Sequence, residues 1–169
     1  TSATTQTDVV LHDERAALDF DAEGLVAHEL AHQWFGDLVT CREWSHAWLN
    51  ESFATYCEIL FAEHDRGADE AIYDLYRDAA SYLDEAGAKY SRPTVTRQWR
   101  ESFNLFDAHL YERGACVLHF LRRQLGESAW RAALKTWLER HAYTAVETRD
   151  LVEAFRAATG RSIDRWIEE

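Results

Sequence analysis

The sequence predicts a mainly α-helical protein with a short β segment at its N-terminus. After about residue 20, apolar side chains recur every three or four positions in one stretch after another, which is the spacing of one helix face. The first eleven residues are instead rich in Thr and Val, which favour extended backbone. Gly36, Gly67 and Gly160 each follow a helical stretch, where glycine commonly ends a helix.

The elements of the first part of the chain follow in order. We expect a strand over residues 1–11 and a helix over residues 23–35. Residues 37–45 predict a short extended or loop segment. The next helix is expected over residues 46–64, where six apolar residues have helical spacing: Trp48, Leu49, Phe53, Tyr56, Ile59 and Leu60.

The remaining elements are helices and one long loop. A helix over residues 68–86 should bury the face formed by Ile72, Leu75, Tyr76, Ala79 and Leu83. Residues 87–107 contain the only proline and no clean period, which predicts a loop. Helical stripes then run from Leu110 to Leu125 and from Trp130 to Leu138. Thr144 and Glu147 are spaced like a capping box ahead of a helix with Leu151, Val152 and Phe155, and a last short helix carries Ile163, Trp166 and Ile167.

Composition excludes several classes of protein. The net charge of −12 argues against a nucleic-acid partner, because phosphate binding needs basic patches. No apolar run approaches the roughly 18–20 residues that span a bilayer. The three cysteines show no CxxC spacing and are interpreted as structural thiols. The chain contains no Met, even at position 1, so we expect it to be a piece of a longer protein, whose compartment the sequence does not indicate.

The stretch VAHELAHQWFGD, residues 26–37, carries the strongest chemical pattern. His28 and His32 are four residues apart, so one helix face can offer both imidazoles to one metal ion. Glu29 is rotated off that line and could face a metal-bound water as a base. Chance alone would produce this pattern in about 4% of sequences of this composition, so a coincidental pair of histidines on a plain helical domain is the competing reading.

Glu51 strengthens the metal hypothesis. Catalytic zinc typically has three protein ligands and one open position. Glu51 follows His32 by nineteen positions on the next expected helix, and a helix–turn–helix could bring it back to the histidine pair. A glutamate at one fixed position lowers the chance match to below about 1%.

The segments HELAHQWFGDLVT and WLNESFATYCE together resemble the zinc aminopeptidases of the aminopeptidase N family, a gluzincin family that includes the leukotriene hydrolase. The family pattern is HExxH, eighteen residues, then Glu; Ser52 stands where Gly is usual. The resemblance implies that His28, His32 and Glu51 bind one zinc ion per chain, with Glu29 as general base and acid. Further positions match the family: Gln33, Trp34, Phe35, Gly36, Trp48, Leu49, Asn50 and Phe53.

A second block, LYERGACVLHFLR, resembles the family segment whose Tyr stabilises the oxyanion. The resemblance gives that role to Tyr111, although a lone Tyr is more often a core or surface aromatic. Glu58 lies two turns after Glu51 and could hold a ligand imidazole by its other N–H; a plain surface glutamate is the alternative. Asn50 and Asp37 are weaker candidates of the same kind.

The resemblance implies that residues 1–169 are a single, partial domain: the helical part of a thermolysin-like zinc metallopeptidase catalytic domain. The family's Gly-Ala-Met-Glu-Asn motif, which grips the substrate ammonium, cannot occur in a chain without Met. We therefore expect the N-terminal β-domain and the upper part of the catalytic domain to lie outside this chain. Apolar helix faces left open by their absence would need another cover, such as a partner chain.

The expected function is a zinc-dependent metallopeptidase, an aminopeptidase that hydrolyses N-terminal residues from peptides. Zinc would polarise the scissile carbonyl, Glu29 would move the protons, and Tyr111 would donate to the oxyanion. Three alternatives stay open: epoxide hydrolysis on the same site, a non-catalytic scaffold or inactive zinc-binding fragment of the family, and a plain helical domain. The sequence does not indicate side-chain specificity.

Overall fold

The structure of the chain is a computed structural model that describes residues 3–19 and 21–168. This part of the chain is mainly helical, with a small two-stranded parallel sheet, as the fold class predicted. The helices are α1 (Glu23–Ala31), α2 (Trp48–Asp65), α3 (Ala68–Ala88), α4 (Glu112–Leu125), α5 (Glu127–His141), α6 (Thr148–Thr159) and α7 (Asp164–Glu168). The strands are β1 (Val39–Cys41) and β2 (Thr144–Val146), and 3-10 turns cover Asp8–Val10, Ala16–Leu18, Trp44–His46 and Ser102–Leu105. Among the described helices, none is both long and apolar enough to cross a membrane.

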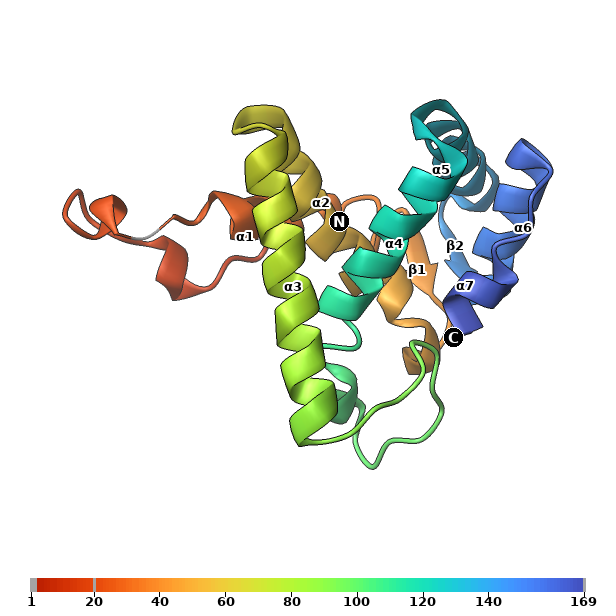
Figure 1. Cartoon of the computed structure of the whole chain (residues 1–169), viewed down its shortest axis with the longest axis horizontal. Coiled ribbons are helices and arrows are strands. Elements are labelled where there is room, and N and C mark those ends of the chain that lie inside the picture. The colour runs from red at the N-terminus through yellow and green to blue at the C-terminus, as the bar shows by residue number, and fades with distance from the viewer. Residues whose placement is uncertain (1–2, 20, 169) are drawn as a thin grey trace.

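Helix α2 is the centre of the arrangement, because it packs against α1, α3 and α4. Figure 1 shows α3 and α4 beside it, with α5 and α6 forming a second pair towards the C-terminus. Strand β1 pairs in parallel with β2, with Val39 opposite Thr144 and Cys41 opposite Val146. This pairing joins the segment between α1 and α2 to the segment between α5 and α6.

The core around α2 is aromatic. The Phe53 ring of α2 stacks on Phe35, with centroids 4.5 Å apart, and on Trp137 of α5 at 5.4 Å. Trp48 at the start of α2 is fully buried, and its indole N–H donates to the Thr148 hydroxyl at the start of α6. The apolar positions predicted over residues 46–64 thus join α2 to the segment that follows α1 and to α5 and α6, which fixes where its other residues point.

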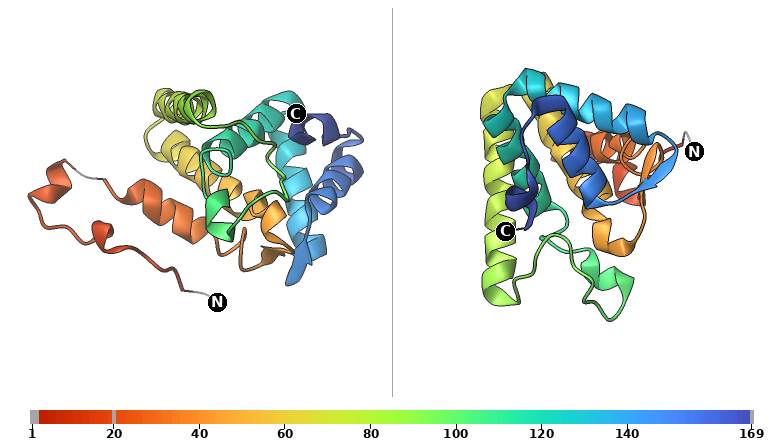
Figure 2. Two further views of the ribbon diagram at one scale, coloured as in Figure 1. Left: turned by 90° about the horizontal axis from the view of Figure 1, so that it is seen from below. Right: turned by 90° about the vertical axis from the view of Figure 1, so that its right-hand side faces the viewer.

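The strand expected over residues 1–11 is wrong for the residues described. Residues 3–7 have no regular secondary structure and Asp8–Val10 form a 3-10 turn; residues 1 and 2 lie outside the described part. The segment runs away from the helices (Figure 2). A strand needs a neighbour for its backbone N–H and C=O groups, and the sheet of the described chain pairs only β1 with β2. Thr and Val propensity alone supplies no such neighbour.

The expected helix over residues 23–35 ends early. Regular α1 stops at Ala31, and residues 32–35 turn tightly towards β1, where Phe35 bridges to Val39. Gly36 permits this close turn, because a Cβ added there would meet the His32 carbonyl oxygen at 3.0 Å. The other expected helices agree with the structure within a few residues, and residues 87–107 form the expected loop apart from the turn at Ser102–Leu105.

The predicted buried face of α3 is largely wrong. Ile72, Tyr76 and Leu83 are 63%, 68% and 65% exposed, whereas Leu75 does pack on the core. The buried residue of α3 is Ala71. Apolar side chains occur around most of this helix, so their spacing could not select the side that faces α2 and α4. A cover for such exposed apolar side chains, such as a partner chain, stays a prediction.

The capping box lies three residues later than predicted. Thr144 belongs to β2, and the box is formed by Glu147 and Asp150 at the start of α6. The Glu147 amide donates to Asp150 Oδ2 at 2.7 Å. The predicted pair, Thr144 and Glu147, has the same three-residue spacing as the pair that forms the box, so spacing alone could not distinguish them.

Candidate metal centre

Three side chains from α1 and α2 converge on one point. His28 lies in the last turn of α1, His32 follows at its C-cap, and Glu51 lies in the first turn of α2. Both Nε2 atoms are 3.3 Å from the same oxygen, Oε2 of Glu51. One potential ligand atom from each residue lies within 4.8 Å of the other two. The predicted helix–turn–helix return is therefore present, and the three groups could hold a metal ion.

The outer nitrogen of each imidazole is also held. Nδ1 of His28 lies 2.7 Å from Oε1 of Glu58, and Nδ1 of His32 lies 2.9 Å from the carbonyl oxygen of Phe35. Both partners are acceptors, so each Nδ1 carries a proton and donates it. In the neutral imidazoles the Nε2 lone pairs are then directed to the point shared with Glu51. Such a pattern orients histidines for metal binding.

The charges around this point favour a cation. Burial, which would lower the pKa of His28, is outweighed by hydrogen bonds to Glu51 and Glu58, and its pKa rises to about 9. Burial would raise the pKa of Glu51, but the two histidines hold it down at about 2. The two effects show that a buried carboxylate here is stabilised by positive charge beside it. A divalent metal would supply that charge in place of protons.

The three candidates for holding a ligand imidazole, Glu58, Asn50 and Asp37, differ in how closely they approach the ligands. Glu58 does contact His28 directly. Asn50 lies near the turn after His32, since a Cβ added at Gly36 would be 3.7 Å from its Nδ2. The Asp37 backbone N–H donates to the His32 carbonyl oxygen at 2.9 Å. Asn50 and Asp37 therefore border the turn that follows His32.

Tyr111 reaches the same region from α4. It is the N-cap residue of that helix, and its ring centroid lies 6.1 Å from that of His28. Burial and the carboxylates of Glu51, Glu112 and Glu29 raise the pKa of its phenol, so the hydroxyl stays protonated and able to donate. Glu29 is half-buried on α1 beside His28. Glu29 and Tyr111 thus approach the histidine–glutamate group from two helices.

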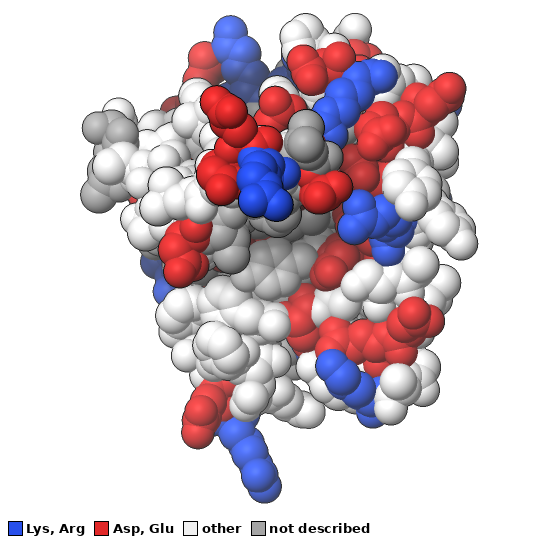
Figure 3. Space-filling view, turned by 90° about the vertical axis from the view of Figure 1, so that its left-hand side faces the viewer, with Lys and Arg blue, Asp and Glu red and all other residues white. Residues whose placement is uncertain are grey.

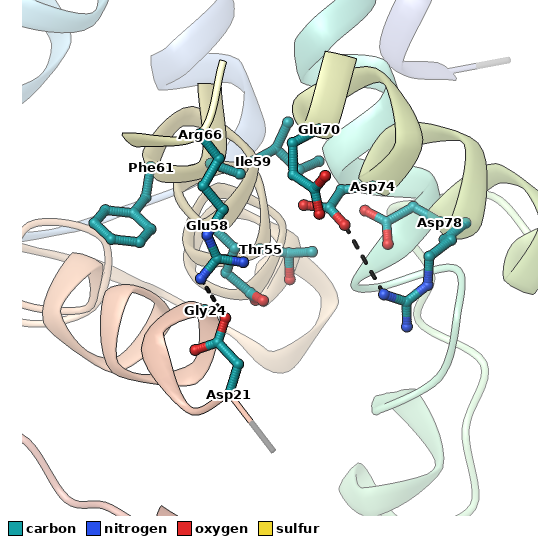
Figure 4. Close-up of a pocket in the computed structure, with 12 residues that line it drawn as sticks. Asp21, Gly24, Thr55, Glu58, Ile59, Phe61, Arg66, Glu70, Asp74 and Asp78 are labelled. Carbon is teal, nitrogen blue, oxygen red and sulfur yellow. Dashed lines mark hydrogen bonds and ion pairs between the residues drawn. The ribbon is translucent and has the colours of Figure 1, made fainter. Parts of the chain in front are cut away.

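A pocket of about 390 Å³ opens behind Glu58, between α1, α2 and α3. Figure 4 shows Glu58, Glu70, Asp74 and Asp78 directed towards it, with Arg66 held by Asp21 at its edge. Burial and the nearby carboxylates of Glu112 and Glu58 raise the pKa of Asp78 to about 7. Acidic side chains also outnumber basic ones across the face drawn in Figure 3. The Glu58 carboxylate that contacts His28 therefore lies among other acidic side chains.

The three cysteines and the buried histidine at position 109 have structural surroundings. All three cysteines are free and half-buried, and burial raises the pKa of each thiol, that of Cys57 to about 12. His109 is fully buried and lies against the rings of Tyr82 and Tyr90. These surroundings agree with the interpretation of the cysteines as structural thiols.

Sequence reasoning missed two contributors. The Phe35 carbonyl that orients His32 has no sequence signal, because every residue carries a carbonyl group. Asp107 organises the turn before Tyr111 by accepting from the Leu110 N–H at 3.0 Å. An Asp four residues before an expected helical Tyr is a usable turn signal, although it is common.

Comparisons with known proteins identify a family for this chain. The model of the peptidase family M1 domain matches residues 2–169. The chain therefore belongs to peptidase family M1. It is 35% identical over 150 residues to aminopeptidase M1 of Arabidopsis thaliana, covering 83% of this chain and 16% of that protein. It is 37% identical over 160 residues to aminopeptidase N of Lactococcus lactis, covering 86% and 18%.

A solved structure of the same family has a similar fold. The chain superimposes with a TM-score of 0.72 and 33% identity on an M1 zinc metallopeptidase mutant from Deinococcus radiodurans bound to a Tyr-Ser-Ala substrate. The match covers 86% of this chain and 33% of that one. The chain thus spans under a fifth of the length of the two aminopeptidases above and a third of that metallopeptidase.

Proposed function

We propose that this chain carries the zinc centre of an aminopeptidase, which removes N-terminal residues from peptides. The observation that carries the proposal is the convergence of His28, His32 and Glu51, each Nε2 being 3.3 Å from one Glu51 oxygen. We further propose that residues 1–169 form the helical part of a single catalytic domain. Membership of peptidase family M1 supports both statements.

The donor set fits zinc. Two neutral imidazoles and one carboxylate are three typical ligands of a catalytic zinc site, which leaves a fourth position open. Their outer partners, Glu58 and the Phe35 carbonyl, hold the rings in the orientation that metal binding needs. When bound, zinc would supply a Lewis acid for the scissile carbonyl and would lower the pKa of water towards about 7.

The chain's own residues would move the protons and hold the charge. Glu29 is adjacent to His28 and half-buried, so its carboxylate can accept a proton from water and deliver it to the leaving amine. The Tyr111 phenol remains protonated because burial and the nearby carboxylates raise its pKa. It can donate to the oxygen that becomes negative, which is worth about 3–4 kcal/mol in comparable oxyanion sites.

The substrate class is taken from the relatives. Two similar proteins are named aminopeptidases, and the Deinococcus radiodurans metallopeptidase mutant has a Tyr-Ser-Ala substrate bound. The chain spans under a fifth of the length of these two aminopeptidases, so the aminopeptidase activity is proposed for the protein that contains this chain.

The test is Glu29→Gln, measured in the protein that contains this chain. We expect Glu29→Gln to keep stoichiometric zinc, because Glu29 is not among the three ligands, and to lose at least a hundredfold in kcat on an aminoacyl-arylamide, in line with the usual contribution of a general base. His32→Ala should lose the metal as well. Hydrolysis by Glu29→Gln at the rate of the unmodified protein would refute the role of Glu29, and full zinc content in His32→Ala would refute the ligand set.

A further inference from the structure

Ser52, the residue after Glu51, joins α2 to the start of α4. Its side chain is fully buried. Its hydroxyl donates a 2.5 Å hydrogen bond to the carbonyl oxygen of Leu110, the residue before Tyr111. One short buried hydrogen bond therefore connects the backbone beside Tyr111 to the side chain of the residue after Glu51.

The other side of Leu110 is held as well. Its N–H donates to Oδ1 of Asp107 at 3.0 Å. The Asp107 carboxylate also accepts from the Arg92 guanidinium at 2.6 and 2.9 Å and from the Tyr90 hydroxyl at 2.8 Å. Asp107 and Arg92 side chains are only 5% and 12% exposed. The peptide groups on both sides of Leu110 are thus fixed, one by the loop and one by Ser52.

Gly114 shows how closely the two helices approach at this point. It lies one turn after Tyr111, and a Cβ added there would be 1.8 Å from Oγ of Ser52 and 2.4 Å from its Cβ. The same added atom would be 3.6 Å from Cα of Ser52, an ordinary contact distance. The contact is therefore limited by the Ser52 side chain and not by the backbone of α2.

We propose that Ser52 is a positioning residue: its hydroxyl and its close packing on Gly114 fix the Tyr111 phenol relative to Glu51. The importance of that position for turnover rests on the proposed function. The position itself is a property of the chain and can be measured without activity. An error of about 1 Å in such a group can cost on the order of a hundredfold in rate, so a fixed link between the two helices has a functional reason.

The first test removes the hydroxyl alone. Ser52→Ala keeps the Cβ packed against Gly114. Ser45→Ala is the matched control, because Ser45 is also buried and its hydroxyl donates to Glu43 and to no other residue in the described part of the chain. Both are made in the protein that contains this chain, with 3-fluorotyrosine incorporated and the Tyr111 ¹⁹F signal assigned through Tyr111→Phe. We expect the Tyr111 signal to shift or broaden in Ser52→Ala and to stay unchanged in Ser45→Ala, at equal zinc content.

Kinetics supply the second readout. Ser52→Ala should lose about tenfold or more in kcat on an aminoacyl-arylamide with KM little changed, since positioning of an oxyanion donor acts in the transition state. An unchanged Tyr111 signal together with unchanged kcat would overturn the positioning role. An unmodified protein that binds zinc but hydrolyses no such substrate would refute the proposed function instead, and the ¹⁹F comparison would still decide the role of Ser52.

A size exchange separates packing from hydrogen bonding. Gly114→Ala should force α2 and α4 apart and displace the Tyr111 signal. Ser52→Gly combined with Gly114→Ala should restore the melting temperature, because the two atoms nearest to the new methyl group are then removed and Cα of residue 52 is 3.6 Å away. The double variant still lacks the hydroxyl, so we expect its kcat and ¹⁹F signal to resemble those of Ser52→Ala. Recovery of both to the unmodified values would overturn the role of the hydroxyl and leave packing alone to position Tyr111.

Discussion

Replacing Glu58 with Gln should weaken zinc binding about tenfold without unfolding the protein. The carboxylate lies 2.7 Å from Nδ1 of His28, and its side chain is 35% exposed. Gln keeps a neutral acceptor at the same place, so the loss is the charge assistance of one partly solvated hydrogen bond, about 1.4 kcal/mol. That free energy corresponds to a factor of about ten in the dissociation constant. Glu58→Ala, which also removes the acceptor, should reach the upper end of the usual effect, about a hundredfold.

The assay is a competition titration of zinc against a chromophoric chelator at fixed pH. Glu70→Gln is the matched control, because Glu70 lines the same acidic pocket from α3. Its substitution changes the local charge equally but leaves the bond to His28 in place. Equal zinc affinity in Glu58→Gln and the unmodified protein would refute the orienting role. An equal loss in Glu70→Gln would show that pocket charge, and not the hydrogen bond, is responsible.

Three further predictions concern pH and the core. Because the metal-free pKa of His28 is raised to about 9, zinc must displace a proton from this imidazole when it binds. The zinc affinity should therefore rise about tenfold per pH unit between pH 6.5 and 9. A zinc affinity that stops rising near pH 6.5 would contradict this. The same raised pKa stabilises the metal-free protein below pH 6.5, and this stability is lost as pH rises through 9. The pKa of Asp78 is raised to about 7, so its ionisation costs stability as pH rises from about 4 through 7; Asp78→Asn should gain roughly 1–2 kcal/mol in urea unfolding at pH 8 and almost nothing at pH 4. Phe53→Ala should lose about 3–5 kcal/mol in the same measurement, because its ring stacks on Phe35 and Trp137, and a loss below about 1 kcal/mol would show that this stack is not central to the core.

The three residues of the metal group show what sequence spacing can and cannot predict. His28 and His32 are local neighbours, so helical geometry alone predicted that they share a face. Glu51 is on another helix, and only its fixed distance along the chain and the family resemblance pointed to it. The structure brings it to 3.3 Å from both imidazoles because α1 and α2 pack against each other.

The errors have one common origin. The strand over residues 1–11, the buried face of α3 and the capping box at Thr144 each rested on a local pattern that also fits a different structure. A run of Thr and Val forms a strand only beside a partner, and a helix with apolar side chains around most of its surface can turn more than one side inwards. The neighbouring elements decide between such alternatives.

The sequence by itself therefore determined the helical class, the order of the helices and the identity of the potential metal-binding side chains, because these depend on residue type and on spacing along the chain. The tertiary structure decided what surrounds them: the Phe35 carbonyl on His32, the Ser52 bond to Leu110 and the approach of Tyr111 to His28. Contacts between α2 and α4 join residues more than fifty positions apart. Their geometry is set by packing, which no local pattern of residues encodes.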